Sequence, residues 1–164
     1  MSKVQSQKEV FLNGEGDAWC LRNAETVAGI NYADDPVVKA FEKISPSFGR
    51  SNKDLDVSVL EIGCGEGFRL EWLSRRFKIA AYGVDPSEVS IGRAIKKGVK
   101  AFRGTADSLQ FPDNSFDIVI FGFCLYLCDR NDLFEIAREA DRVLKSKSWL
   151  VISDFFSEVP IRRD

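Results

Sequence analysis

Apolar residues in this chain gather in five short runs, each separated from the next by a more polar stretch. Runs that are apolar at almost every position, such as Ile118-Val-Ile-Phe121, are typical of strands covered on both faces of a parallel sheet. The pattern predicts strands at Val57–Ile62, Ala80–Val84, Lys100–Arg103, Phe116–Phe123 and Trp149–Asp154.

The stretches between and before these runs carry apolar residues at helical spacing. The stretch after the first run places Leu70, Leu73 and Phe77 on one stripe and leaves Arg69 off it. A later one begins with Pro86, and proline favours the first position of a helix. The pattern predicts helices at Glu15–Ala28, Pro36–Ile44, Glu66–Phe77, Pro86–Lys97 and Asn131–Leu144.

Strands that alternate with helices imply βαβ units, and therefore an α/β fold with an open, mostly parallel, doubly wound sheet. The first two helices precede the first strand, so we expect residues 1–54 to form an N-terminal helical lid and linker, and residues 55–164 to form the core. A length of 164 residues and a hydrophobic content of 45% suit one domain with a substantial core.

The first predicted strand runs into a glycine-rich segment, Glu61-Ile-Gly63-Cys-Gly65-Glu-Gly67, and Asp85 follows about 20 residues later at the end of the second strand. Glycines let a ligand approach the backbone closely, and a carboxylate at that place accepts hydrogen bonds from ribose hydroxyls. A dinucleotide fingerprint, G-x-G-x-x-G, would require glycine where the chain has Phe68. The pattern therefore predicts a ribose-containing ligand and disfavours a nicotinamide cofactor.

With Glu61 before the glycines, the segment resembles the first motif, E/D-x-G-x-G-x-G, of class I S-adenosylmethionine (SAM)-dependent methyltransferases. The resemblance extends from about Val57 to Asp154 and implies a Rossmann-like methyltransferase fold with SAM as the cofactor. The family usually has seven strands in the order 3-2-1-4-5-7-6, whereas this chain ends at Asp164, soon after its fifth strand. We therefore expect the last strand hairpin to be missing, in a C-terminally truncated fragment or in a naturally short form.

The resemblance implies a role for each matching position around the methionine part of the cofactor. The backbone of Gly63, Cys64 and Gly65 approaches it, and Glu61 supports this loop and the cofactor's amino group, directly or through water. The backbone near Gly122 and Phe123, at the end of the fourth strand, meets the same part.

For the nucleoside part, the resemblance implies that Asp85, followed by Pro86, holds the ribose hydroxyls, with a helix N-cap as the alternative role of Asp85. Asp107 would accept from the adenine amino group while the amide of Ala106 reaches a ring nitrogen. The alternative for Asp107 is a turn residue that caps its own backbone.

The segment from Gly14 to Asn23 is similar to an opening motif in a subset of bacterial methyltransferases, whose N-terminal helix covers the cofactor. Trp19 is then a candidate cofactor contact, and an ordinary amphipathic lid helix anchored by this tryptophan is the alternative.

Many members of the family have a histidine just after the fourth strand, but this chain has Cys124-Leu-Tyr126-Leu there and no histidine at all. The easiest general base is therefore absent, and the catalytic residues are unknown. Tyr126 and Asp154 remain as polar candidates, with structural roles as the alternative. Asp117 is expected to be structural, because ligands of open α/β sheets gather at the carboxyl ends of strands and this residue lies at a strand's start.

The composition of the chain indicates which kinds of partner to expect. A net charge of −2 without a basic stretch gives no reason to expect a nucleic acid and favours a small-molecule substrate. Four cysteines without C-x-x-C spacing, and no histidine, predict no metal site and indicate reduced thiols. The N-terminus does not have the apolar region of a signal peptide, and no apolar run approaches the roughly 18 residues of a membrane span, so we expect a cytoplasmic protein without a membrane partner.

The leading interpretation is a SAM-dependent methyltransferase that acts on a small molecule by in-line transfer. The alternative is a SAM-binding domain or fragment without catalytic activity of its own, because the missing hairpin often shapes the acceptor site. A nucleotide-cofactor oxidoreductase is disfavoured by Phe68. Finally, Trp149–Asp154 would be an uncovered apolar edge strand, which predicts self-association through that edge.

Overall fold

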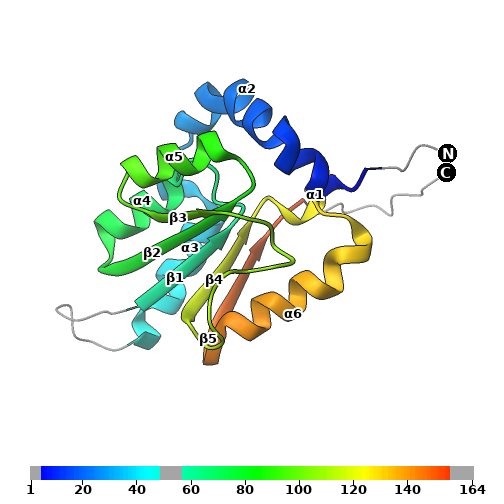
Figure 1. Ribbon diagram of the computed structural model, residues 1–164. Helices are drawn as coiled ribbons and strands as arrows, with labels where there is room; N and C mark the ends of the chain where they lie inside the picture. The colour runs from blue at the N-terminus through cyan, green and yellow to red at the C-terminus, as the bar shows by residue number, and fades with distance from the viewer. Residues whose placement is uncertain (1–4, 49–56, 156–164) are drawn as a thin grey trace.

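The computed structural model describes residues 5–48 and 57–155. Five strands form one sheet in the order β3-β2-β1-β4-β5, and every neighbouring pair is parallel (Figure 1). The strands are β1 (Val57–Ile62), β2 (Ile79–Asp85), β3 (Lys100–Arg103), β4 (Phe116–Gly122) and β5 (Leu144–Ser153). The predicted α/β fold with an open, parallel, doubly wound sheet is confirmed, and each of the five predicted strands is present.

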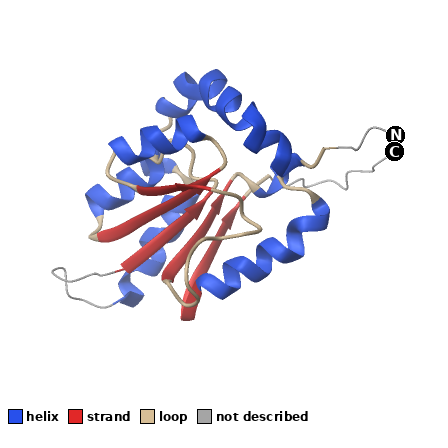
Figure 2. Cartoon of the chain, in the orientation of Figure 1, coloured by secondary structure: helices blue, strands red, loops and turns tan. Residues whose placement is uncertain are grey.

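Helices precede the sheet and connect its strands (Figure 2). The longer ones are α2 (Gly16–Ala28), α3 (Pro36–Ile44), α4 (Phe68–Arg76), α5 (Glu88–Lys96) and α6 (Leu133–Val143). A short helix α1 (Gln7–Val10) and a π-helical segment η1 (Phe11–Glu15) lead into α2, and single turns at η2 (Tyr32–Asp34), η3 (Ser45–Phe48), η4 (Leu125–Leu127) and η5 (Arg130–Asp132) complete the elements.

Several predicted boundaries differ from the observed ones by a few residues, and two of these differences are informative. Pro86 does not begin a helix: α5 starts at Glu88, because the hydroxyl of Ser87 accepts a hydrogen bond from the Ser90 amide at 3.0 Å and caps the helix there. The last strand begins at Leu144 instead of Trp149, with a shift in its register against β4 and a left-handed residue, Lys147, in its first half.

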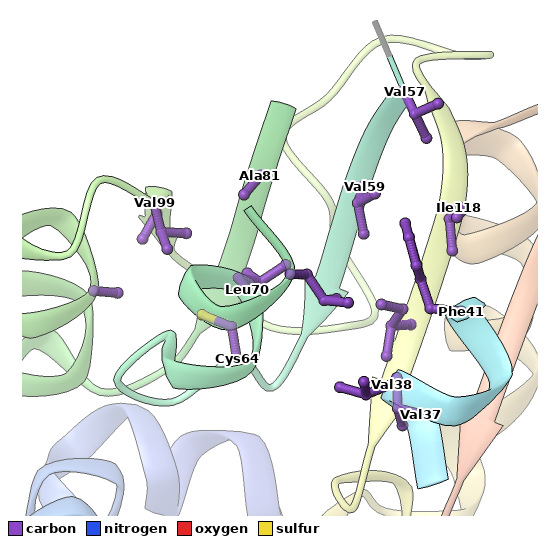
Figure 3. Close-up of a cluster of buried hydrophobic side chains, with 14 of the residues drawn as sticks. Val37, Val38, Phe41, Val57, Val59, Cys64, Leu70, Ala81, Val99 and Ile118 are labelled. Carbon is purple, nitrogen blue, oxygen red and sulfur yellow. The ribbon is translucent and has the colours of Figure 1, made fainter. Parts of the chain in front are cut away.

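The core has two layers, one on each face of the sheet. On one face α3, α4 and α5 pack against the strands, and Figure 3 shows Phe41 of α3 beside Ile118 of β4, with Val37 and Val38 in the same cluster. On the other face α6 contributes Ile136, Ala140 and Val143 to a second cluster with residues of β1 and β4. The residues of α3 therefore belong to the packed core, because Val37, Val38 and Phe41 are all at most 2% exposed.

The elements α1, η1 and α2 lie at the carboxyl ends of the strands, above the sheet in Figure 1. The helix α2 is fastened to α5 through Asp17, whose carboxylate accepts from the Ser87 hydroxyl at 2.6 Å and from the Val89 amide at 3.0 Å. The division of the chain into a lid and a core stays a prediction, since residues 49–54 and 156–164 lie outside the described part.

Candidate functional site

A cavity of about 410 Å³ lies at the carboxyl ends of β1, β2 and β4, beneath α1 and α2. Sites for small molecules occupy this range of volume and this place in open parallel sheets. Ten of the residues predicted to bind the cofactor line it, namely Trp19, Glu61, Gly63, Cys64, Gly65, Asp85, Pro86, Ala106, Gly122 and Phe123. The fold thus brings together residues that lie far apart in the sequence.

The glycine loop after β1 forms the floor of this cavity. Gly65 has a φ of 51°, and a Cβ built on it would meet no atom within 4 Å. The backbone is therefore bare where it faces the cavity, and a ligand can approach it without a side chain in between. The loop is tied to the next strand, because the amides of Gly63 and Cys64 donate to the carbonyl of Val84 at 2.8 Å and 3.1 Å.

Asp85 is the last residue of β2, and both of its carboxylate oxygens accept hydrogen bonds. Its Oδ2 accepts from the Gly65 amide and its Oδ1 from the Ser87 amide, each at 2.9 Å. Burial raises the pKa of Asp85, while these two backbone bonds oppose the rise. Each carboxylate oxygen can accept a further hydrogen bond, so Asp85 keeps the capacity to hold ribose hydroxyls. It is not the N-cap of α5, since Ser87 has that role.

Asp107, unlike the other residues predicted to bind the cofactor, does not line the cavity. The ammonium group of Lys8 lies 2.5 Å from its Oδ2 and 3.3 Å from Oδ2 of Asp132. Burial acts to raise the pKa of Asp107, but hydrogen bonds from Lys8 and Thr105 outweigh it and hold this pKa below the usual range. The adenine contact of Asp107 stays a prediction, and Lys8, which does line the cavity, competes for the same carboxylate.

The loop that carries Ala106 and Asp107 is held by α6. Glu139 is buried and accepts from the Leu109 amide at 2.8 Å, while Arg142 donates to the carbonyls of Leu109 and Phe111 at 2.9 Å and 2.8 Å. The hydrogen bonds from Arg142 lower the pKa of Glu139 to about 2. This ion pair fixes the wall of the cavity next to Ala106.

At the other end of the cavity, three ionisable side chains from separate elements meet. Arg69 of α4 donates from Nε and Nη2 to the two carboxylate oxygens of Asp35, at 3.1 Å and 3.0 Å, and from Nη1 to Oε1 of Glu61. Its side chain is 11% exposed. Although Arg69 lies off the apolar stripe of its helix, its side chain is buried, because Asp35 at the start of α3 and Glu61 of β1 supply buried partners.

Glu61 is 1% exposed, and its Oε2 has no hydrogen-bond partner among the described residues. Burial raises the pKa of Glu61 to about 7, although Arg69 acts to lower it. Buried carboxylate oxygens normally have a partner. An orphaned acceptor beside the cavity is consistent with a ligand that brings a hydrogen-bond donor.

The two catalytic candidates behave differently. Oδ2 of Asp154 accepts from the amides of Leu125 and Tyr126, at 2.9 Å and 3.2 Å, and Asp154 does not line the cavity, so it holds the turn after β4. Tyr126 does line the cavity and is 49% exposed, and burial raises the pKa of its hydroxyl. A catalytic role of either residue stays a prediction. Asp117 is structural as predicted, since it accepts from Ser58 and pairs with Lys145.

Phe123 follows β4 with a φ of 60°, which is unusual for a bulky residue. Its amide donates to the carbonyl of Ser153 at 2.7 Å, and this bond to the end of β5 holds the strained turn in place. Strain of this kind is found at binding sites, and the turn presents Phe123 to the cavity.

Sequence reasoning missed several residues that line the cavity: Lys8, Asn23, Tyr32, Phe68 and Arg69. The ring of Tyr32 stacks on that of Phe68 with 6.4 Å between the centroids, and burial raises the pKa of its hydroxyl to about 12. All but Phe68 and Arg69 belong to the segment before β1. No local pattern in that segment marks which side chains reach the strand ends.

Within residues 5–48 and 57–155, no group of three or more potential ligand side chains is placed to hold a metal ion. The four cysteines are free thiols. None of the helices in the described part of the chain is long and apolar enough to cross a membrane.

Comparison with known proteins gives a match to the methyltransferase domain family over residues 60–152, more than half of the chain. The chain is 32% identical over 152 residues to a demethylmenaquinone methyltransferase of Listeria welshimeri, a match that covers 74% of this chain and 63% of that protein. It is 34% identical over 101 residues to a fatty-acid O-methyltransferase of Mycolicibacterium smegmatis, covering 58% of this chain and 36% of that protein. The chain therefore spans less than two thirds of the length of these relatives.

The fold is also that of a solved SAM-dependent methyltransferase from Mesorhizobium loti. The TM-score is 0.60 at 21% sequence identity, and the similarity covers 76% of this chain and 56% of that one. The likeness agrees with the five-stranded parallel sheet.

Proposed function

We propose a methyl-transfer reaction for this chain, which belongs to the SAM-dependent methyltransferase family: transfer of a methyl group from SAM to a small, largely apolar acceptor. The observation that carries the proposal is the cavity at the strand ends, in which Asp85 is hydrogen-bonded to the glycine loop at Gly65. SAM is the cofactor of the family, and it supplies a methyl group on a positively charged sulfur.

The residues around the cavity fit this cofactor. The bare backbone at Gly65 admits a ligand, Asp85 has acceptor capacity left for two hydroxyls, and Glu61 has an orphaned acceptor for an amino group. The cavity wall also has more carboxylates than cations: the carboxylates are Asp85, Glu61 and Glu66, and the cations are Lys8 and Arg69. A cationic sulfonium ligand is favoured by such surroundings.

The protein's part in the reaction is to position the two reactants and to exclude water. In-line displacement at a sulfonium needs no acid for the leaving group, and positioning of this kind is worth roughly 7–11 kcal/mol. The thiols offer no ready nucleophile or base, because burial raises the pKa of Cys64 and Cys124 well above the usual range and that of Cys128 to about 11. The acceptor therefore needs an atom that is already nucleophilic, such as an amine, a carboxylate or an acidic carbon.

The acceptor's apolar character is inferred from the lid side of the cavity. Trp19, Val27 and Ile30 of the α2 region line it together with Tyr32 and Phe68. The names of the two relatives refer to a fatty acid and to demethylmenaquinone, both of them largely apolar. The proposal includes a small-molecule acceptor of this class and no nucleic-acid or membrane partner. It also includes a cytoplasmic location, because the free thiols are typical of a reducing compartment.

The test has two stages. Calorimetry with S-adenosylhomocysteine, SAM and NAD should show binding of the first two and none of NAD, and NAD binding without a response to S-adenosylhomocysteine would refute the proposal. Turnover of labelled SAM is then measured against fatty acids, quinols and amines, with short polar acids as the matched control. Binding without turnover of any acceptor would favour the second candidate, a SAM-binding domain without activity, which the partial coverage of the relatives supports.

A further inference from the structure

The cavity wall beside Ala106 belongs to a loop without helix or strand, residues 104–115 between β3 and β4. Gly104, Thr105 and Ala106 of this loop line the cavity. A segment without regular structure keeps one conformation only where other elements hold its backbone groups, because fixing the backbone costs conformational entropy. The position of the Ala106 amide therefore depends on what holds the rest of the loop.

Two side chains of α6 hold the middle of this loop. Glu139 is 4% exposed, and its Oε2 accepts from the Leu109 amide at 2.8 Å. Arg142 donates from Nη2 to the Leu109 carbonyl at 2.9 Å and from Nη1 to the Phe111 carbonyl at 2.8 Å. Leu109 is thus fixed at both its amide and its carbonyl, a few residues beyond Ala106. We call the two side chains the Glu139–Arg142 clamp.

The clamp is itself rigid. Arg142 donates from Nε to Oε1 and from Nη2 to Oε2 of Glu139, both at 2.8 Å. Such a bidentate pair of two planar groups defines one relative orientation. The end of the loop is held to the same helix, because the Asn114 amide donates to the Arg142 carbonyl at 2.9 Å and the Ser115 amide to the Val143 carbonyl at 2.8 Å.

Neither residue of the clamp can act on a ligand directly. Glu139 and Arg142 do not line the cavity. A guanidinium has five N–H groups, and those of Arg142 make five hydrogen bonds, to Glu139, Leu109, Phe111 and Asp113. No donor of Arg142 is left for a ligand, so any effect of the clamp on binding must pass through the loop.

We infer that Glu139 and Arg142 are positioning residues that set the preference of the cavity for adenine, because they fix the loop that carries Ala106. The inference rests on the proposed function and on the predicted placement of the adenine ring. It goes beyond both, since it assigns the selectivity for the base to a helix that does not reach the cavity.

The chemistry of the base supplies the test. Adenine has a hydrogen-bond acceptor at N1 and a donor amino group at C6, whereas hypoxanthine has a donor at N1 and an acceptor oxygen at C6. In the predicted placement, the Ala106 amide and the Asp107 carboxylate match adenine and oppose hypoxanthine. This discrimination requires a fixed loop, because a loop that can shift avoids the opposed pairs.

The measurement is the ratio of the dissociation constants of S-inosylhomocysteine, which has hypoxanthine in place of adenine, and S-adenosylhomocysteine. Wild-type protein should bind the adenine compound about tenfold to a hundredfold more tightly, since an unmatched buried donor or acceptor costs that much affinity. Equal affinity for the two compounds in the wild-type protein would overturn the inference without any variant.

Arg142→Met removes five hydrogen bonds and should bring the ratio close to one. Glu139→Gln keeps an oxygen that can accept from the Leu109 amide and should lower the ratio less. Arg138→Met is the matched control and should keep the wild-type ratio. Arg138 lies on the same helix and also pairs with Glu139, but its hydrogen bonds within the described residues go to Glu135 and Glu139 and not to the loop.

The ratio separates positioning from general damage, because a distorted cavity weakens both compounds together. An unchanged ratio in folded Arg142→Met protein, with or without a loss of affinity, would show that the clamp is only structural. If that variant does not fold, Arg142→Lys replaces it, since lysine keeps the charge but has only three N–H groups. An unchanged ratio in both Arg142→Lys and Glu139→Gln would likewise overturn the inference. If wild-type protein binds neither compound, it is the proposed function that fails.

Discussion

The carboxylate of Asp85 accepts a hydrogen bond from the backbone amide of Gly65 at 2.9 Å. This bond joins the end of β2 to the glycine loop after β1, the two features that first indicated a ribose-containing ligand. It fixes the loop and the carboxylate relative to each other before any ligand arrives. Preorganisation of this kind lowers the cost of binding.

Asp85→Ala should weaken binding of S-adenosylhomocysteine by about tenfold to a hundredfold, because a charged acceptor for two hydroxyl donors is worth roughly 1.5–3 kcal/mol. Asp85→Asn keeps one oxygen that can accept from Gly65 and should lose less. Calorimetry measures both, with circular dichroism to show that the variants fold. An unchanged dissociation constant for a folded Asp85→Ala protein would mean that the carboxylate serves only the local backbone.

Lys8 and Asp107 are expected to affect cofactor binding in opposite directions. Asp107→Ala should cost at most about tenfold in affinity, since in the predicted placement of the adenine ring the amide of Ala106 still contacts it. Lys8→Met frees the Asp107 carboxylate from the ion pair at 2.5 Å and should leave affinity equal or improved. A double-mutant cycle on the two residues measures their coupling. A larger loss from Asp107→Ala than from Asp85→Ala would contradict the placement of the adenine.

The raised pKa of Glu61 predicts that the stability of the ligand-free protein depends on pH. Its folded pKa of about 7 lies above the ordinary value of 4.5, so between those values the folded protein keeps a proton that the unfolded chain releases. The stabilisation from the protonated carboxyl is fully present below about pH 4.5 and is lost as pH rises toward 7. The slope is at most about 1.4 kcal/mol per pH unit for one group.

Thermal unfolding at pH 6 and pH 8 tests this dependence in wild type and in Glu61→Gln, which is neutral at both values. The variant should gain stability relative to wild type on going from pH 6 to pH 8. Glu135→Gln is the control, because Arg138 lowers the pKa of that exposed carboxyl and it stays ionised throughout the range. Parallel pH profiles for wild type and Glu61→Gln would show that this carboxyl does not titrate near neutrality.

We predict that the chain self-associates through β5, the strand at the edge of the sheet. Within the described residues β5 pairs only with β4, and Trp149, Leu150 and Ile152 are 44%, 44% and 55% exposed. Apolar edges of this kind favour pairing with another chain. Sedimentation should show concentration-dependent association of the 164-residue chain, reduced in Ile152→Lys. The control Phe134→Lys changes a residue on α6 that is 85% exposed and should have little effect. A monomeric wild-type chain at high concentration would contradict this.

The strands, the glycine loop and Asp85 could be predicted from the sequence because their signals are local. A buried parallel strand is a continuous apolar run, and a close approach of backbone to ligand requires glycine at neighbouring positions. One error in the predicted helix boundaries arose where two local signals competed. Pro86 favours a helix start, but the hydroxyl of Ser87 accepts a hydrogen bond from the Ser90 amide and moves the start to Glu88.

The environment of Arg69 was decided by tertiary structure alone. On its own helix it belongs to the polar face, and its partners Asp35 and Glu61 come from α3 and β1. Lys8 likewise meets Asp107 across 99 positions of sequence. The sequence by itself determined which segments become strands and helices and where the glycine loop leaves the backbone bare, because apolar periodicity and glycine spacing act within a few residues. Only the folded chain decided which charged side chains share the cavity, because a buried charge is stable only beside partners that long-range packing brings to it.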